Sequence, residues 1–363
     1  MTTARPDLRA LTSIRGIAAW LVVLYHIRLS MNWAPDTLIA VFAKGYLAVD
    51  FFFLLSGFVL WLTYADQLHQ GGASGAARFL QRRVARIWPL HLLMLAGAAC
   101  FATALAVTGR PNAAYPFGEL PLHVLLIQSW GLTDELHWND PAWSISAEFA
   151  AYLAFPVLAT AVDWRRLPDW GLVAIGLAPL IALWLLFAGL GHATLGQDIT
   201  HLGVLRCLAE FTTGTVVCAL WQRWRDRPML PALLAAGIGL AIGTAWIVGA
   251  LPEPLAVPVA FAALLLALAL SAEWRSNPLN GRVVHYLGEI SYATYLSHFL
   301  LFVAFKLAFV DDPRAVPPGL IALYLAMVAA ASVALYHFVE RPAQRLINRL
   351  PWPQRAPRAA TSH

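Results

Sequence analysis

The sequence contains few charged residues. They make up 12% of its 363 residues, whereas hydrophobic residues make up 60% and the mean hydropathy is +0.64. Soluble domains carry about a quarter of their residues as charged side chains, roughly twice the share found here. The composition therefore excludes a water-soluble protein of this size and indicates an integral membrane protein.

Cysteine is scarce as well. Cys100, Cys207 and Cys218 lie within apolar runs and lack the short spacings of metal ligands. The pattern therefore indicates neither a disulfide framework nor a zinc site, and we expect no metal. A cleavage site of small residues is also missing after the first apolar segment, so we expect this segment to be retained as a helix.

Long apolar runs are abundant, and a run of about 20 residues crosses the roughly 30 Å hydrocarbon core of a bilayer as an α-helix. We predict an all-α fold, a polytopic membrane helix bundle of about ten spans that forms a single domain over residues 1–350. The segment 120–132 is apolar but short and contains Pro121, so we expect it to lie at the interface or to re-enter. The predicted spans are residues 10–29, 45–64, 87–109, 143–162, 171–190, 202–221, 229–251, 255–272, 283–310 and 317–339.

Basic residues concentrate in every second loop, and such residues accumulate on the cytoplasmic side of membranes. With both termini cytoplasmic, 18 of the 25 basic residues fall in the inside segments. A crossing by residues 120–132 would largely remove this bias. Residues 351–363 are Pro-rich and basic, and we expect a disordered cytoplasmic tail there. The pI of about 9.3 follows from this topology, and we expect no nucleic-acid partner because no basic-aromatic binding face accompanies it.

The first predicted span carries an arginine and a histidine. Arg15 and His26 are 11 residues apart, which places them on one helix face about 16 Å apart along the axis. Because charge is costly in hydrocarbon, such residues usually face a protein interior or an aqueous cavity. The alternative is that Arg15 extends to lipid headgroups while His26 caps the outer interface.

Other polar residues are expected in the outer half of the bundle, where they would share a cavity. Arg206 and Glu210 are four residues apart, a spacing that permits an ion pair. Ser291, Tyr295 and His298 share a face of the ninth span, although for His298 an interhelical hydrogen bond is an equal alternative. The candidates for this cavity are Asp50, Trp143, Ser144, Arg206, Glu210, Tyr295 and His298.

A basic cluster precedes the third span. The stretch "RFLQRRVARIWP" places Arg78, Arg82 and Arg86 on one helix face, with Arg83 beside them. The cytoplasmic bias of basic residues accounts for many such clusters. The alternative is a phosphate clamp, because guanidinium groups make bidentate contacts to phosphate oxygens, and Arg15 would extend such a clamp inward.

Together these stretches resemble acyltransferase family 3, the integral membrane O-acyltransferases of bacterial surface carbohydrates. The resemblance spans the chain and rests on Arg15 and His26, followed in order by the segments "FFFLLSGF" (51–58), "RRVARIWP" (82–89), "PAWSISAEF" (141–149) and "GEISYATYLSH" (288–298). It implies transfer of an acyl group, commonly acetyl, from cytoplasmic acyl-coenzyme A to a carbohydrate or lipid-linked sugar. It also implies a location in the bacterial cytoplasmic (inner) membrane.

The resemblance makes Arg15 and His26 the leading functional residues, with Glu148 in support. Attack of a hydroxyl group on a thioester needs a base that titrates near neutral pH, and histidine does so. We hypothesise that His26 takes the hydroxyl proton while Glu148 or Asp50 orients its ring. A covalent acyl-histidine intermediate is less favoured.

The donor would bind through arginines. Arg15 would contact a phosphate or polarise the thioester, and Arg82, Arg83 and Arg86 would hold the nucleotide end of acyl-coenzyme A. A transporter that exports a sugar or a lipid-linked intermediate is the competing function, because many carriers also combine about ten spans with buried charges. The acceptor, the acyl group and the oligomeric state are not determined by the sequence.

Overall fold

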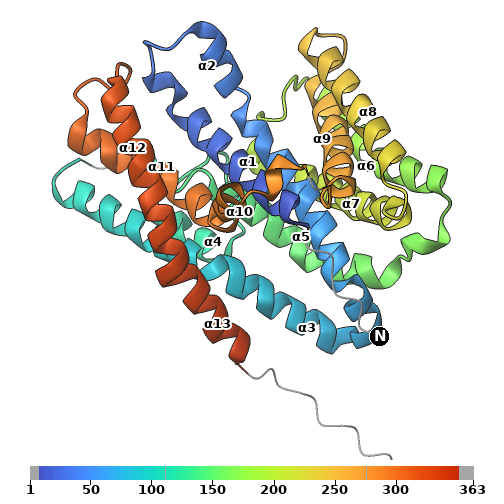
Figure 1. The fold of residues 1–363 in the computed structure, drawn as a ribbon. Coiled ribbons are helices and arrows are strands. Elements are labelled where there is room, and N and C mark those ends of the chain that lie inside the picture. Colours follow the sequence, from blue (N-terminus) through green and yellow to red (C-terminus); the bar gives the residue numbers. More distant parts are fainter. Residues whose placement is uncertain (1–7, 111, 275, 351–363) are drawn as a thin grey trace, which may run out of the picture.

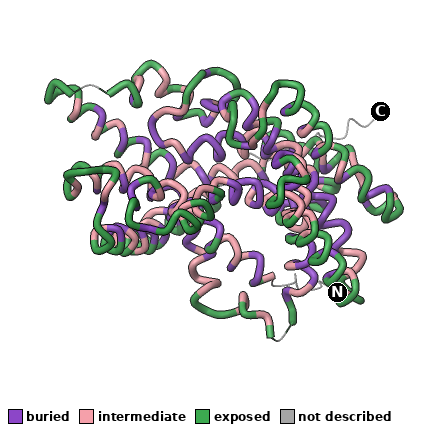
Figure 2. The backbone as a smooth tube through the Cα atoms, turned by 90° about the horizontal axis from the view of Figure 1, so that it is seen from above, coloured by how far each residue is buried: buried purple, intermediate pink, exposed green. Residues whose placement is uncertain are grey.

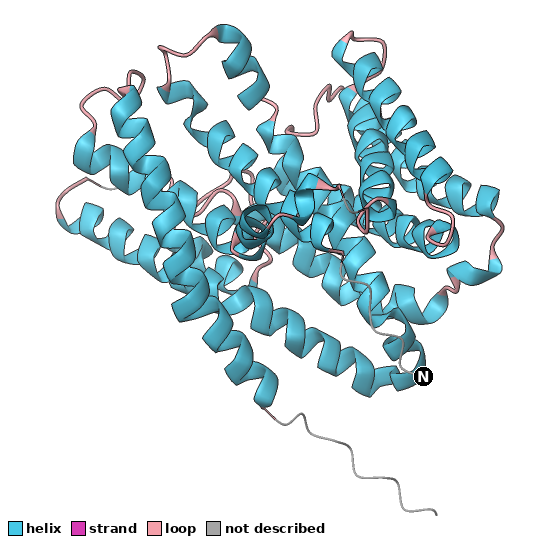
Figure 3. Cartoon of the chain, viewed as in Figure 1, coloured by secondary structure: helices cyan, strands magenta, loops and turns pink. Residues whose placement is uncertain are grey.

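The computed structural model describes residues 8–110, 112–274 and 276–350, and these are almost entirely helical (Figures 1 and 3). No strand occurs within these ranges, where one isolated bridge pairs Met31 with Ala315. The all-α prediction is confirmed. The long helices are α1 (Arg9–Ile27), α3 (Ala48–Val107), α5 (Ala142–Ala161), α6 (Asp169–Gly189), α7 (Ile199–Trp224), α8 (Met229–Ile247), α9 (Glu253–Leu270), α11 (Ser291–Phe309) and α12 (Pro318–Leu335). The short ones are α2 (Asp36–Phe42), α4 (Leu120–Leu125), α10 (Arg282–Glu289) and α13 (Arg341–Arg349).

Nine helical stretches in the described ranges are long and apolar enough to cross a membrane, against about ten predicted spans. The difference lies in α3, whose 60 residues cover most of both the second and the third predicted span. An unbroken helix of that length would extend about 90 Å, three times the hydrocarbon thickness. Gly72 interrupts it with φ 49° and ψ −137°, a conformation that glycine adopts without a Cβ clash. The two halves leave this bend in different directions (Figure 1), so the chain is a multi-pass membrane protein.

The segment 120–132 does not cross the bundle, as predicted. Its helix α4 has six residues and ends at Leu125, and the next residue, Leu126, has a φ of 57°. Two side chains of α3 bind its backbone, since Trp88 Nε1 donates to the Val124 carbonyl at 2.9 Å and His91 Nε2 lies 2.8 Å from the His123 carbonyl. The segment is therefore held against the second half of α3.

The connections between helices gather at two ends of the bundle. At one end, Lys44 pairs with Glu253 at 2.8 Å, and Glu253 also accepts a hydrogen bond from the Leu195 backbone N–H at 3.0 Å. At the other end, Arg223 pairs with Asp169 at 2.6 Å. Arg165 of the neighbouring connection pairs with Asp66 of α3. That this end faces the cytoplasm stays a prediction.

Helices α3 and α7 cross at very close range in the middle of the bundle. A Cβ atom added to Gly57 would lie 1.9 Å from the Phe211 carbonyl oxygen, and one added to Gly214 would lie 1.9 Å from that of Leu54. Small residues let membrane helices approach until their backbones touch, which maximises van der Waals contact. This crossing fixes the position of α3 beside α5 and α7, where the site described below is built.

Buried residues concentrate towards the middle of the molecule, and exposed ones cover its periphery (Figure 2). Helix α8 illustrates the periphery, because only Ala232 and Ala235 of its 19 residues are buried. A helix that is apolar on every side and largely exposed suits contact with lipid. The predicted tail 351–363 lies outside the described residues, and the single domain over residues 1–350 stays a prediction.

Candidate active site

A cavity of about 160 Å³ lies between α1, α3, α5 and α11. Apolar residues of α3, such as Phe52, Phe53 and Leu60, form much of its wall. This volume is large enough for several water molecules, since each water molecule needs roughly 10–15 Å³. The polar residues that line it are Arg15, Ser56, Arg83, Arg86, Ser144, Glu148, Tyr152, Ser291, Tyr292 and Tyr295.

One part of the cavity is cationic. Arg15, Arg83 and Arg86 supply three guanidinium groups, and Glu148 is the one carboxylate in the described lining. Arg83 donates through Nη2 to the Tyr64 hydroxyl at 3.2 Å, while its buried Nε has no hydrogen-bond partner in the described ranges. A buried, unpartnered N–H is costly unless a ligand or water accepts from it. The cavity is therefore arranged to take an anionic group.

Arg15 reaches the cavity because α1 and α10 cross closely. A Cβ atom added to Gly288 would lie 1.8 Å from the Thr12 carbonyl oxygen, and one added to Gly16 would lie 2.7 Å from the Gly288 nitrogen. Arg15 makes no ion pair within the part of the chain that the structure describes, so its charge is available to the cavity. The prediction that Arg15 faces the protein interior is confirmed.

Arg86 is held from the C-terminal end of the chain. It forms an ion pair with Glu340, which is 1% exposed and ends the π-helical turn η6 (Tyr336–Glu340). The Arg86 guanidinium also lies over the Tyr292 ring, 5.4 Å from its centroid. Glu340 was not predicted as a site residue, although it is the only acidic residue in the segment 313–363.

The structure does not bring the predicted arginine clamp together at one place. Arg83 and Arg86 line the central cavity, whereas Arg78 and Arg82 line a second cavity of about 340 Å³ at the bend of α3. Tyr64 lies between the two groups, since it lines the second cavity and accepts a hydrogen bond from Arg83. The ion pair with Glu340 explains why Arg86 does not turn towards Arg82.

Tyr295 of α11 lines the central cavity and also contacts residues beyond it. Its hydroxyl lies 2.7 Å from Ser144 Oγ and donates to the Pro141 carbonyl at 3.1 Å, so the ring reaches from α11 across to α5. Beyond Tyr295 lies the His298 ring, with 6.1 Å between ring centroids. His26 does not line the cavity. The predicted passage between Arg15 and His26 is thus interrupted by Tyr295.

His26 is partnered by a second histidine. Its Nδ1 lies 2.9 Å from the Val22 carbonyl oxygen and 3.2 Å from Nε2 of His298, which is fully buried. No carboxylate in the described ranges bonds to His26, so the expected orientation of its ring by Glu148 or Asp50 is wrong. Glu148 lines the cavity on the other side of Tyr295, and Asp50 is occupied elsewhere.

Asp50 binds Arg206 with both carboxylate oxygens, which lie 2.5 Å from Nε and 2.6 Å from Nη2. The Arg206 guanidinium also lies over the Trp143 ring at 5.3 Å. The predicted pair between Arg206 and Glu210 is therefore wrong, and both Glu210 oxygens are buried without a hydrogen-bond partner in the described ranges. Asp50, Arg206, Glu210 and Trp143 lie outside the central cavity. The ion pair between Asp50 and Arg206 ties α3 to α7.

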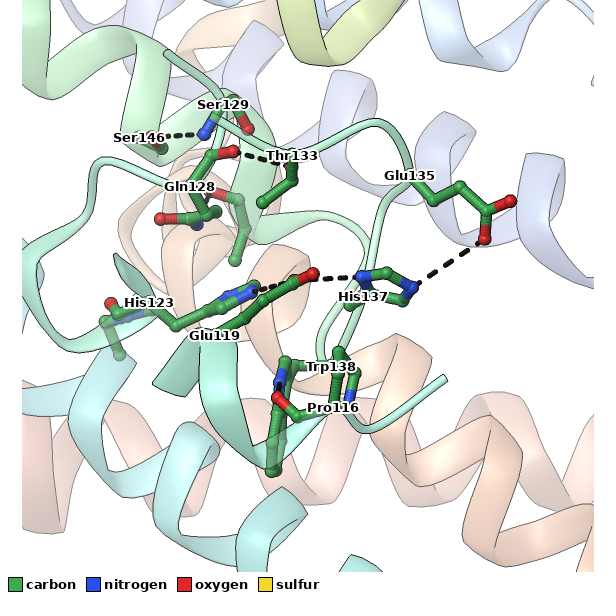
Figure 4. Close-up of polar contacts among 12 residues, drawn as sticks. Pro116, Glu119, His123, Gln128, Ser129, Thr133, Glu135, His137, Trp138 and Ser146 are labelled. Atoms are coloured by element: carbon green, nitrogen blue, oxygen red, sulfur yellow. Dashed lines mark hydrogen bonds and ion pairs between the residues drawn. The ribbon is translucent and has the colours of Figure 1, made fainter. Parts of the chain in front are cut away.

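A polar cluster in the segment 119–140 was not predicted, although its alternating acids and histidines are visible in the sequence (Figure 4). Glu119 Oε2 lies 2.9 Å from His137 Nδ1 and 3.9 Å from His123 Nε2. On its other side, His137 Nε2 lies 3.7 Å from Glu135 Oε2. Burial, followed by the charges of His91 and His137, lowers the pKa of His123 to about 3.

A small cavity of about 10 Å³ adjoins this cluster, enough for one water molecule. It is lined by Asn139 and Asp140, which precede α5, and by Gln128 and Trp143. The side-chain oxygens of Gln128 and Asn139 are buried and lack partners in the described ranges. Burial raises the pKa of Asp140 to about 6. An ordered water would satisfy these groups.

The described residues contain no group of three or more histidine, cysteine, aspartate or glutamate side chains arranged to hold a metal ion. The three cysteines are free, and Cys207 and Cys218 are buried. That the protein needs no metal stays a prediction.

Comparison with known proteins gives a consistent result. The model of a family described as an acyltransferase domain matches residues 8–337. Acyltransferase MdmB of Streptomyces mycarofaciens is 30% identical over 371 residues, which cover 94% of this chain and 93% of that protein. SACOL0978 of Staphylococcus aureus (strain COL), named as a candidate O-acetyltransferase, is 22% identical over 94% of this chain and 58% of its own length. No solved structure matches the chain.

Proposed function

This chain belongs to the acyltransferase family whose model covers residues 8–337, and on that premise we propose that it transfers an acyl group from acyl-coenzyme A to a hydroxyl group of a carbohydrate or lipid-linked sugar. We take acetyl as the acyl group, because the Staphylococcus aureus relative is named as an O-acetyltransferase. We place the protein in the bacterial cytoplasmic membrane, with the donor approaching from the cytoplasmic side. The observation that carries the proposal is the cationic part of the central cavity.

Coenzyme A is an anion with a diphosphate and a 3′-phosphate, and guanidinium groups bind phosphate oxygens in bidentate fashion. Arg15, Arg83 and Arg86 face the cavity against a single lining carboxylate, Glu148. The unpartnered Nε of Arg83 is one donor that such a ligand would satisfy. An uncharged sugar in transit would not need three guanidinium groups, so this feature favours a donor site over a transport path for free sugar.

The second cavity, at the bend of α3, suits the nucleotide end of the donor. Arg78 and Arg82 line it, and it is about 340 Å³ in volume. Tyr64 separates it from Arg83, and an aromatic ring beside arginines offers a face for an adenine ring. We place the adenosine moiety at the bend and the thioester end of the molecule in the central cavity.

His26 would act as the general base. The hydroxyl oxygen of the acceptor forms the new ester bond with the acyl carbon, and the bond between this carbon and the thioester sulfur breaks. The hydroxyl proton passes to His26 and then to the leaving thiolate, which departs as the free thiol of coenzyme A. Positioned general bases contribute typically 10²- to 10⁴-fold to such a rate.

The proposal requires Tyr295 to move, because its ring separates the central cavity from His298 and His26. The hydrogen bonds of the Tyr295 hydroxyl to Ser144 and to the Pro141 carbonyl link neutral groups and are worth about 1 kcal/mol each. Binding of both substrates can supply this amount. Ser144 and Tyr295 would then contact the reacting groups.

The test uses the full chain, purified and reconstituted in lipid vesicles. Thiol release from acetyl-coenzyme A is measured with and without a panel of mono- and disaccharides. We expect saccharide-dependent thiol release that falls about 100-fold or more in His26→Ala, and no change in His69→Ala, a histidine exposed on α3. Equal release by folded His26→Ala protein would contradict the role of His26. Saccharide flux without thiol release would support the transporter instead.

A further inference from the structure

The ring of His26 is held on several sides by groups from α1 and α11. The rings of Tyr25, Phe299 and His298 surround it at centroid distances of 4.9, 5.4 and 4.9 Å. The helices that carry these rings are themselves fixed, because Val23 and Ile27 of α1 pack against aromatic residues of α11 and α12 in one buried cluster. The orientation of the His26 ring is therefore set by packing as well as by hydrogen bonds.

The hydrogen bonds of His298 determine where its proton lies. His298 Nδ1 is 3.2 Å from the Thr294 carbonyl oxygen, and a carbonyl oxygen only accepts hydrogen bonds. The proton of the neutral ring is therefore on Nδ1, and Nε2 carries a lone pair. The fold supports this geometry, since Tyr324 donates to the His298 carbonyl at 2.9 Å and so ties α12 to the same turn of α11.

The same reasoning then applies to His26. The 3.2 Å contact between His298 Nε2 and His26 Nδ1 needs one proton, and His298 Nε2 does not have it. His26 Nδ1 must therefore carry the proton. The Val22 carbonyl oxygen, 2.9 Å from the same Nδ1, also requires a donor there. Both contacts select the tautomer of His26 whose Nε2 holds the free lone pair.

We infer that His298 is a positioning residue that fixes His26 in the tautomer with a basic Nε2, taking the part that a carboxylate takes in a catalytic triad. This inference rests on the proposed function, in which His26 accepts the hydroxyl proton. When Nε2 takes that proton, the ring becomes a cation and its Nδ1–H still donates to His298. The bond between them is then charge-assisted and stronger, so it stabilises the charged state that forms during transfer. A neutral partner does this without placing a second charge among the membrane helices.

The activity test compares two substitutions of His298. Glutamine keeps an oxygen acceptor near the position of Nε2, whereas leucine keeps bulk and removes the acceptor. We expect His298→Leu to lower kcat about 10- to 100-fold, less than the loss of the base itself, and His298→Gln to recover a large part of the rate. The KM for acetyl-coenzyme A should not change in either variant, because His298 does not line the donor cavity. His91→Gln is the matched control, another buried histidine that bonds a backbone carbonyl.

A second measurement does not depend on activity. Nitrogen-15 NMR of histidine-labelled protein in lipid, with the His26 signals assigned by their loss in His26→Gln, reports which ring nitrogen is protonated. We expect a proton on Nδ1 of His26 in the wild type and in His91→Gln. In His298→Leu only the Val22 carbonyl still holds that proton, so we expect a larger share of the tautomer protonated on Nε2 than in the wild type. A proton on Nε2 in the wild type, or an unchanged ratio in His298→Leu, overturns the inference. If the tautomer is as expected but no thiol release occurs, the proposed function fails and the pairing of the two histidines stands.

Discussion

Asp50 and Arg206 bind each other through two hydrogen bonds, although 156 residues separate them in the sequence. Asp50 is fully buried and Arg206 is 1% exposed. Arg206 makes a further bond to the Leu195 carbonyl at 2.8 Å, so its donors are used within the bundle. The pair joins the start of α3 to α7 on the same two helices that cross at Gly57.

Removing one partner of this pair leaves a buried charge without compensation. We expect Asp50→Asn to lower the free energy of unfolding by about 3–5 kcal/mol. The free energy of unfolding is measured in detergent, with circular dichroism as the signal, and Asp226→Asn at an exposed position is the control. The double variant Asp50→Leu with Arg206→Met should recover much of the loss, because neither charge remains. A midpoint for Asp50→Asn equal to that of the wild type would show that the pair contributes little.

The crossing of α3 and α7 predicts opposite effects for two glycines of the same helix. Gly57→Ala places a Cβ atom 1.9 Å from a backbone oxygen, so the helices must separate, and we expect destabilisation of about 3 kcal/mol or more. Gly97 has nothing within 4 Å of its Cβ position, so Gly97→Ala should be neutral or stabilise by up to about 1 kcal/mol through helix propensity. Thermal unfolding of both variants measures these effects. Equal unfolding midpoints in Gly57→Ala and Gly97→Ala would contradict the close crossing of α3 and α7.

The raised pKa of Asp140 predicts that the free energy of unfolding depends on pH. Burial raises its pKa from 3.8 to about 6 in the folded protein, whereas the unfolded chain loses this proton near pH 4. Between these values the folded state binds more protons, so its stability falls as pH rises from about 4 to 6, by up to about 3 kcal/mol. Asp140→Asn cannot ionise and should unfold at a higher temperature than the wild type at pH 7.5 and at the same temperature at pH 4.

The control for this comparison is Asp226→Asn, an exposed carboxylate that makes no ion pair within the described ranges. We expect no pH-dependent difference from the wild type in that variant. If Asp140→Asn and the wild type differ equally at both pH values, the carboxylate does not titrate as described and the substitution acts through packing.

The separation of the arginines predicts different effects on two ligands. If the bend of α3 holds the nucleotide, Arg82→Gln should weaken coenzyme A more than dephospho-coenzyme A, which lacks the 3′-phosphate. Arg83→Gln should weaken both ligands equally, because Arg83 lines the central cavity. Isothermal titration calorimetry measures the Kd of each ligand for each variant. If the ratio of the Kd for coenzyme A to the Kd for dephospho-coenzyme A is the same in both variants, the bend does not bind the 3′-phosphate.

The sequence predicted those parts of the fold that depend on local pattern. Apolar runs predicted the helices, and the cost of a charge within one of them predicted that Arg15 faces the protein interior. It could not predict partners that depend on how helices pack. The spacing of Arg206 and Glu210 suggested a pair within one helix, but the close approach of α3 gave Asp50 the better bidentate geometry.

For the candidate site as well, local patterns were predicted and partners from distant parts of the chain were not. The segments that form the cavity were identified as motifs, and Ser144, Glu148 and Tyr295 do line it. Glu340 was missed because its partner Arg86 lies 254 residues away and no local pattern connects them. Two further features depend on side-chain positions that helical periodicity does not specify. One is the position of Tyr295 between the cavity and the histidines, and the other is the place of His298, instead of a carboxylate, beside His26.

The most direct test of the account is the affinity of the purified protein for coenzyme A after Arg83→Gln. Arg83 has no ion-pair partner in the described ranges and one unsatisfied donor, so its removal should leave the fold intact. A lost charge-assisted contact is worth about 1.5–3 kcal/mol, so we predict a Kd about 10- to 100-fold higher than in the wild type and an unchanged Kd in the exposed control Arg345→Gln. An unchanged Kd in folded Arg83→Gln protein would contradict the assignment of the central cavity to the donor.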